Sequence, residues 1–155
     1  MRGKKASKRI IAVDAKYSSV VIAKFVNYLM YDGKKSIAQG VVYSALDMVS
    51  KRSERDALEV FAQAIKNIAP AMEVRSKRVG GANYQVPFPV RGDRRQSLAF
   101  RWLLGASRAR KGKAMAERLA DELLAASEGE GAAVRKRQDM QRMADSNRAF
   151  AHFAW

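Results

Sequence analysis

The chain has 155 residues, the length of one domain, and 48% of them are hydrophobic, so it can bury a core. It has no cysteine and a single histidine, His152, which excludes disulfide frameworks, thiolate nucleophiles, Cys-ligated metals and His-based triads. Thirty Lys and Arg against fifteen Asp and Glu give a net charge of +15, which predicts a polyanionic partner.

Residues 1–16 lack periodicity and are predicted to form a basic tail. Apolar residues then recur every three or four positions, which predicts a helix from after Ser18–Ser19 to a stop at Asp32–Gly33. A second helix is expected from about Ser36, a candidate N-cap. A third begins at Asp56, which has Glu59 at capping-box spacing, and ends before Pro70.

Over residues 72–90 the hydrophobic residues recur at every second position, which is typical of β-strands. This pattern predicts a hairpin around a Gly80–Gly81 turn. Pro87 and Pro89 have no backbone N–H to donate to a neighbouring strand. The strands are therefore expected to form a two-stranded ribbon and not part of a larger sheet. The hairpin is expected to set cations opposite aromatic rings, an arrangement that suits nucleic acid: Arg75, Lys77 and Arg78 opposite Tyr84 and Phe88. Packing of Val86, Phe88 and Val90 on the helices is the alternative, and for Phe88 it is the favoured one.

Three further helices are predicted: one from Asp93 with Gln96 at capping-box spacing, one around Met115–Leu124, and one over about Ala133–Arg148. The predicted fold is therefore mainly α, a bundle of about six helices with an inserted two-stranded antiparallel β-ribbon and a basic N-terminal tail. We expect a single domain over residues 1–155. No apolar run is long enough for a signal peptide or a membrane span, so a cytoplasmic protein without a membrane partner is expected.

The net positive charge comes from two segments. Residues 1–9 hold five cations and no acid, and residues 75–113 hold eleven cations and one acid, Asp93. The remaining residues are balanced, with fourteen cations and fourteen acids. A protein surface that serves only solubility carries positive and negative charges side by side. The separation of the net positive charge into two segments therefore favours a binding site for a polyanion.

Arg94, Arg101 and Arg108 are seven positions apart, which places them on one ridge of a helix. Guanidinium groups match phosphate geometry, and Arg91 and Arg95 lie at the start of the same helix. Lys34 and Lys35 precede the second helix, where unpaired N–H groups favour an anion; solvated loop lysines remain the alternative there.

The sequence offers little for catalysis. The carboxylates are interpreted as helix caps or helix-surface groups: Asp56, Asp93, Glu117, Asp121 and Glu122. The Gly129-x-Gly131 pair lacks the third glycine and the preceding strand of a dinucleotide loop. An enzyme is therefore not expected, and neither are a cofactor, a metal or a small-molecule substrate.

On the residues alone, two classes of binding protein stay open. One is an RNA-binding assembly protein. The other is a DNA-binding regulator, because the first two helices joined by Asp32–Lys35 imitate a helix-turn-helix. A cationic membrane-surface protein is disfavoured, because the helices place their apolar faces for a core.

Five stretches resemble the bacterial form of the S-seven family of small-subunit ribosomal proteins. They are EVRSKRVGGANYQVP (Glu73–Pro87), AKFVNYLMYDGKKS (Ala23–Ser36), VVYSALD (Val41–Asp47), RRQSLAFRWL (Arg94–Leu103) and RMADSNRAFAHFAW (Arg142–Trp155). The resemblance is collinear from about Asp14 to the end.

This resemblance implies a structural protein that binds the 3′ major domain of small-subunit rRNA and nucleates assembly of the subunit head. The RNA contacts it implies, together with those that the charge pattern predicts, are Arg2, Lys4, Lys5, Lys8, Arg9, Lys34, Lys35, Arg75, Lys77, Arg78, Arg91, Arg94, Arg95, Arg101, Arg108, Arg110, Lys111 and Lys113. It further implies that the ribbon tip, Val79, Gly80, Gly81, Ala82 and Asn83, faces the exit-site tRNA. The aromatic C-terminus is implied to lie near the mRNA path and a neighbouring platform protein, through Phe150, His152, Phe153 and Trp155.

Overall fold

The structure, a computed structural model, describes residue 3 and residues 10–154. The predicted tail contacts Arg2, Lys4, Lys5, Lys8 and Arg9, and also Trp155, lie outside the described residues. The chain divides after Gln39 into two compact units, which are taken separately below. A single RNA-binding domain therefore remains a prediction.

The N-terminal unit contains α1 (Val20–Leu29), which begins at the predicted place. The N–H of Ile22 donates to Oγ of the N-cap Ser19 at 3.5 Å, and the apolar face of α1 is buried. The helix ends at Leu29, earlier than the predicted stop, because Met30 already has extended ψ. Asp32 and Gly33 both have positive φ and form the turn that follows.

The next helix, α2 (Lys35–Ser53), runs through the division between the units. The N–H of Ala38 donates to the carbonyl of Lys34 at 3.3 Å, so Ser36 lies inside the first turn. The prediction of Ser36 as N-cap was wrong. Lys34 stands just before the helix and Lys35 is its first residue, and both are exposed.

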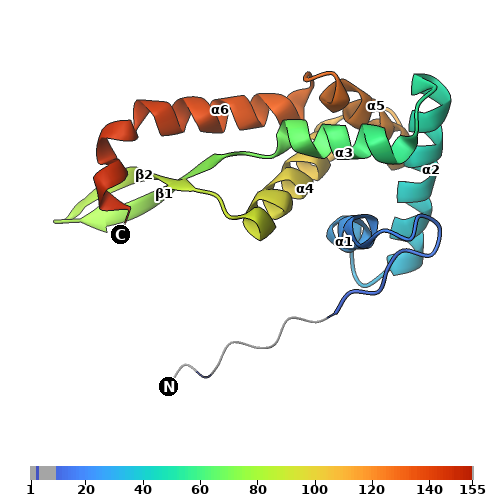
Figure 1. Cartoon of the computed structure of the whole chain (residues 1–155), viewed down its shortest axis with the longest axis horizontal. Coiled ribbons are helices and arrows are strands. Elements are labelled where there is room, and N and C mark those ends of the chain that lie inside the picture. The colour runs from blue at the N-terminus through green and yellow to red at the C-terminus, as the bar shows by residue number, and fades with distance from the viewer. Residues whose placement is uncertain (1–2, 4–9, 155) are drawn as a thin grey trace. The chain divides into compact units, whose positions relative to one another are not determined.

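The C-terminal unit holds the ribbon and most of the helices (Figure 1). Its elements are α3 (Ala57–Ile68), β1 (Met72–Val79), β2 (Ala82–Pro89), α4 (Gly92–Ala109), α5 (Met115–Ser127), α6 (Ala132–Ser146) and a 3₁₀ helix, η1 (Arg148–Phe153). Within the described residues the fold is mainly helical with one two-stranded antiparallel sheet, which confirms the predicted fold class.

The core of this unit forms where α3, α4, α5 and α6 pack on one another. The rings of Phe61 and Phe100 lie 6.4 Å apart between centroids, and Leu103 and Leu119 are fully buried. Asn67 of α3 donates from Nδ2 to two carbonyls at the end of α5, at 2.9 and 3.0 Å. These bonds satisfy acceptors that the end of a helix leaves open.

Helix starts in this unit differ in how they are capped. Asp56 is the N-cap of α3 as predicted, and its Oδ1 accepts from the N–H of Leu58 at 3.2 Å. The cap of α4 is Arg91, without a side-chain cap bond, and Asp93 lies in the first turn. The prediction of Asp93 as a cap was therefore wrong.

The ribbon has the predicted two-residue turn, because Val79 pairs with Ala82 around Gly80 and Gly81. Both glycines have positive φ, as a type I′ turn requires. The predicted pairing holds for Lys77, which lies opposite Tyr84. It was wrong for Phe88, whose partner is Glu73; Arg75 and Arg78 face Val86 and Asn83.

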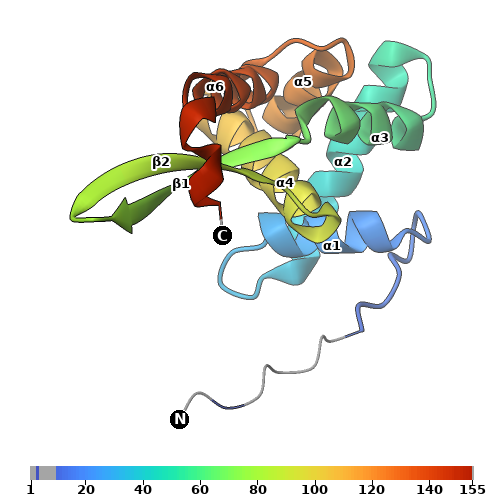
Figure 2. The same ribbon diagram turned by 60° about the vertical axis from the view of Figure 1, so that its left-hand side comes forward.

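The C-terminal segment packs on the ribbon, and Figures 1 and 2 show η1 lying across it. The Tyr84 ring lies 5.2 Å from those of Phe150 and Phe153. Nζ of Lys77 donates to the carbonyl of Phe153 at 2.9 Å. Because an isolated two-stranded ribbon is marginal in water, these contacts stabilise it. Among the described residues, no helix is both long and apolar enough to span a membrane.

Candidate nucleic-acid interface

A groove of about 430 Å³ lies where the base of the ribbon meets the start of α4. Three of its side chains are arginines from the predicted contact set, and one is a carboxylate. The lining residues are Glu73, Arg75, Phe88, Pro89, Val90, Arg91, Arg94 and Ala154.

The carboxylate of Glu73 organises two of these arginines. Glu73 is only 4% exposed, although it falls on the polar side of the strand's hydrophobic alternation. Nε of Arg94 donates to its Oε2 at 3.1 Å, and Nη2 of Arg75 donates to its Oε1. The two guanidinium groups compensate the negative charge of the buried carboxylate. Arg75 and Arg94 are thereby held in one place.

Both guanidinium groups still reach solvent. The side chains of Arg75 and Arg94 are 56% and 43% exposed. The Arg75 guanidinium also lies over the ring of Phe88, 5.3 Å from its centroid. The groove therefore offers two oriented, partly exposed cations beside an aromatic ring.

The start of α4 adds to this positive surface. Arg91 and Arg95 are exposed, and neither forms an ion pair within the part of the chain that the structure describes. The first turn of a helix carries unpaired N–H groups and the positive end of the helix dipole. Together with Arg75 and Arg94, these features make the groove suited to a phosphate.

The predicted ridge on α4 is less uniform than its spacing suggests. Arg94 is engaged by Glu73, Arg101 is exposed, and Arg108 is half-buried. The carbonyls of Arg108 and Arg110 accept from Nη1 of Arg118 at 3.3 and 2.6 Å, so the end of α4 is held by α5.

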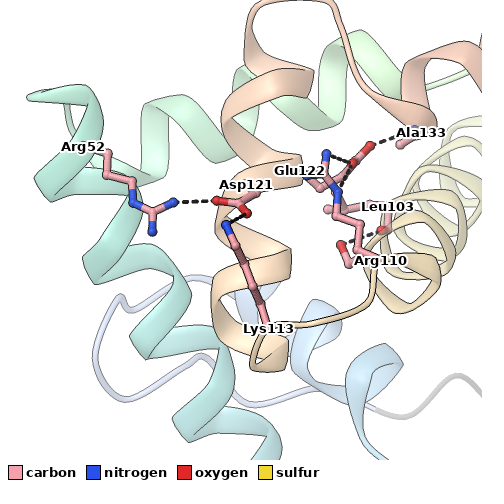
Figure 3. Close-up of polar contacts among 8 residues, drawn as sticks. Arg52, Leu103, Arg110, Lys113, Asp121, Glu122 and Ala133 are labelled. Atoms are coloured by element: carbon pink, nitrogen blue, oxygen red, sulfur yellow. Dashed lines mark hydrogen bonds and ion pairs between the residues drawn. The ribbon is translucent and has the colours of Figure 1, made fainter.

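Arg110, in the loop after α4, has a structural partner. Its Nε and Nη2 donate to Oε2 of Glu122 at 3.0 and 2.6 Å, and Oε1 of Glu122 accepts from the N–H of Ala133 at 2.9 Å (Figure 3). Glu122 is fully buried. Its interpretation as a helix-surface group was wrong: this carboxylate joins the loop after α4, α5 and the start of α6.

Lys113, in the same loop, also has a carboxylate partner. Asp121 accepts from Nζ of Lys113 at 2.9 Å and from Nη1 of Arg52 at 2.5 Å (Figure 3). Burial acts to raise the pKa of Asp121, but the hydrogen bonds and charges of Lys113 and Arg52 outweigh it and hold the pKa below its ordinary value. Asp121 therefore stays ionised at neutral pH.

The other predicted contacts lie apart from the groove. The tip residues Gly80, Gly81, Ala82 and Asn83 are exposed at the end of the ribbon (Figure 2). Of the aromatic C-terminus, Phe150 and Phe153 are half-buried against Tyr84, whereas His152 is exposed. Among the described residues, no group of three or more His, Cys, Asp or Glu is placed to hold a metal.

Comparison with known proteins shows the family of the chain. The family model described as ribosomal protein S7p/S5e matches residues 1–148. The chain belongs to that family. Proteins called "Small ribosomal subunit protein uS7" are 54% identical over 154 residues in Xanthobacter autotrophicus (99% of both chains) and 55% identical over 150 residues in Methylobacterium nodulans (97% of this chain, 96% of the other). The one from Thermotoga neapolitana is 50% identical over 155 residues, all of both chains.

Membership of the S7p/S5e family confirms the resemblance seen in the sequence. The chain is a structural ribosomal protein of the small subunit, with a role in translation, and not an enzyme. RNA binding is expected for the family, and a ribosomal protein of bacterial type is cytoplasmic, as predicted. The DNA-binding alternative is therefore set aside.

Proposed function

We propose that this protein binds the 3′ major domain of small-subunit rRNA through the groove at the ribbon base, and so nucleates assembly of the subunit head. One observation carries the proposal. Arg75 and Arg94 are oriented by buried Glu73 while their guanidinium groups stay partly exposed beside the start of α4. Such an arrangement binds backbone phosphates at little entropic cost, because the side chains are already ordered.

Cations other than Arg75 and Arg94 extend the proposed contact. The exposed residues without an ion pair among the described residues are the first candidates, since their binding to RNA costs no internal contact: Lys34, Lys35, Arg78, Arg91, Arg95, Arg101 and Lys111. Arg110 and Lys113 already neutralise Glu122 and Asp121. We assign these two a supporting role, which is to fix the loop that carries Lys111. The tail cations Arg2, Lys4, Lys5, Lys8 and Arg9 complete the proposed set.

The tip of the ribbon is proposed to reach the exit-site tRNA. Gly80 and Gly81 present no side chain, so another backbone can approach closely, but they supply little binding energy. Arg75 lies further down the strand, at the groove. This separation supports a division of labour in which the base binds rRNA and the tip contacts tRNA.

The C-terminal segment is proposed to lie near the mRNA path and a platform protein. Phe150 and Phe153 use part of their surface on Tyr84. His152 is exposed, with its ring 4.0 Å from that of Phe153 and Nδ1 2.8 Å from the carbonyl of Ala149. We therefore assign the outward contact to His152 and the exposed parts of the two phenylalanines. Trp155, which lies outside the described residues, is included because the family resemblance implies it.

A binding competition tests the proposed function. The full chain is titrated with a transcript of the 3′ major domain, and a 5′-domain transcript of equal length and duplex DNA serve as competitors. We expect the 3′ transcript to bind at least tenfold more tightly than either competitor. In a separate assembly assay, small subunits assembled without this protein should lack the head proteins. Equal affinity for the two transcripts would contradict the proposed target.

A further inference from the structure

We propose that a second hollow, between α4 and α6, takes one unpaired rRNA nucleotide, with its base on Trp102 and its phosphate on Arg101 and Lys136. The inference rests on the proposed rRNA-binding function. It extends the RNA face onto α6, whose cations lie in a segment of balanced charge.

The hollow has a volume of about 290 Å³. It is lined by Arg101, Trp102, Gly105, Ala106, Ala132 and Lys136. This size is just below the roughly 300–1,000 Å³ of small-ligand pockets, so a single base fits it better than a larger group. The half-buried Trp102 supplies an aromatic surface, and small residues leave the approach to it open.

Gly105 lies within α4 and lines the hollow. Glycine inside a helix is less stable than alanine by roughly 0.5–1 kcal/mol. The backbone here has no positive φ, and a Cβ at this position would meet no atom within 4 Å. Neither strain nor crowding therefore requires glycine at position 105. The missing side chain at this position leaves the approach to Trp102 open.

Charge decides which kind of partner the hollow suits. Arg101 and Lys136 are both exposed, and neither forms an ion pair within the described part of the chain. The residues that line the hollow include no acid. Two cations beside a tryptophan match a base with its phosphate, since the ring stacks and the cations pair. An apolar side chain from a neighbouring protein would leave both cations unused.

Filling the hollow tests the proposal without removing a contact. Gly105→Leu projects a side chain into open space and favours the helix. Gly40→Leu is the matched control, because Gly40 is also an exposed glycine within a helix and a Cβ there also meets no atom within 4 Å. With the 3′ major-domain transcript we expect Gly105→Leu to weaken binding about fivefold to a hundredfold, the loss for one stacked base, and Gly40→Leu to leave it unchanged.

Tryptophan fluorescence adds a direct readout. The chain has two tryptophans, so Trp155→Phe makes Trp102 the only reporter. We expect the transcript to quench Trp102, and Lys136→Gln to lower the slope of log K against log salt by about 0.7–0.9.

Tight binding of the transcript with unquenched Trp102 and no effect of Gly105→Leu would overturn the inference and leave the proposed function standing. If Gly105→Leu bound RNA normally but failed to join subunits with the other ribosomal proteins, the occupant would be a protein and the inference would be wrong. Failure of the wild-type chain to prefer the transcript would instead contradict the proposed function.

Discussion

Arg94 of α4 donates from Nε to Oε2 of Glu73 in β1 at 3.1 Å, although the two residues are 21 positions apart in the chain. This bond joins the start of α4 to the base of the ribbon. Because Glu73 also accepts from Arg75, a single buried carboxylate sets the geometry of both guanidinium groups in the groove. The same carboxylate lowers the net charge of the groove by one.

Glu73→Gln separates these two effects. Losing the charged hydrogen bonds is expected to lower the free energy of unfolding by about 1–3 kcal/mol, measured by urea denaturation. Affinity for a non-specific RNA at low salt should rise, because a negative charge is removed beside two cations. Glu59→Gln makes the same change of charge on the exposed side of α3 and is the control. Weaker RNA binding by folded Glu73→Gln would mean that orientation matters more than charge.

Asp121→Asn is expected to show pH-dependent destabilisation. The pKa of Asp121 is lowered in the folded protein, so its ion pairs contribute stability that is fully present above about pH 4, its unfolded value, and is lost as pH falls through the folded pKa. Arg52 and Lys113 are about half exposed, so the loss at pH 7 should be about 1 kcal/mol or less. Urea denaturation at pH 7 and pH 3 checks this; an equal difference between variant and wild type at both would contradict it.

Gly131→Ala tests the buried Glu122 site. A Cβ at Gly131 would lie 2.8 Å from Oε1 of Glu122, and the backbone there has positive φ. Gly129 also has positive φ but meets no atom within 4 Å, so Gly129→Ala measures the backbone strain alone. We expect Gly131→Ala to lower the melting temperature further, with an additional cost of about 1–3 kcal/mol from crowding. Equal effects of the two variants would show that the carboxylate moves aside freely.

Local patterns predicted most of the fold. The change from helical to two-residue periodicity placed the ribbon, and Gly80–Gly81 placed its turn, because both signals depend only on neighbouring residues. Cap residues were predicted less well. Asp93 lies in the first turn of α4 and Ser36 in that of α2, since the helices start one or two residues earlier.

The carboxylates in and near the site were the main omission. Glu73 and Glu122 are buried and form ion pairs with Arg94 and Arg110. These arginines lie 21 and 12 positions away in the chain, and a local sequence pattern does not predict pairing over such a distance. Glu122 did have a signal, because it lies between Leu119 and Ala126 on the apolar face of α5. Lys136 was also missed, since it stands in a segment where cations and acids balance.

Shortening the ribbon tests whether its tip and base have separate roles. Arg78 pairs with Asn83, so replacing Val79–Ala82 by Asn-Gly keeps the register and restores a two-residue turn. No charged contact is removed, so affinity for the 3′ major-domain transcript should change by less than about 1 kcal/mol. Exit-site tRNA retention or reading-frame maintenance should suffer. A large loss of affinity with normal frame maintenance would show that the tip is an rRNA anchor.

The salt dependence of rRNA binding tests the groove and the adjoining face of α4 most directly. Arg91, Arg95 and Arg101 are exposed and unpaired among the described residues, so changing all three to Gln leaves Glu73 neutralised by Arg75 and Arg94. Lys51, Arg55 and Lys66, also exposed, are changed to Gln in a control of equal charge. In filter binding to the 3′ major-domain transcript, the first variant should lower the slope of log K against log salt by about 2–3, and the control should not. An unchanged slope for the first variant, or an equal fall in both, would contradict RNA binding at this face.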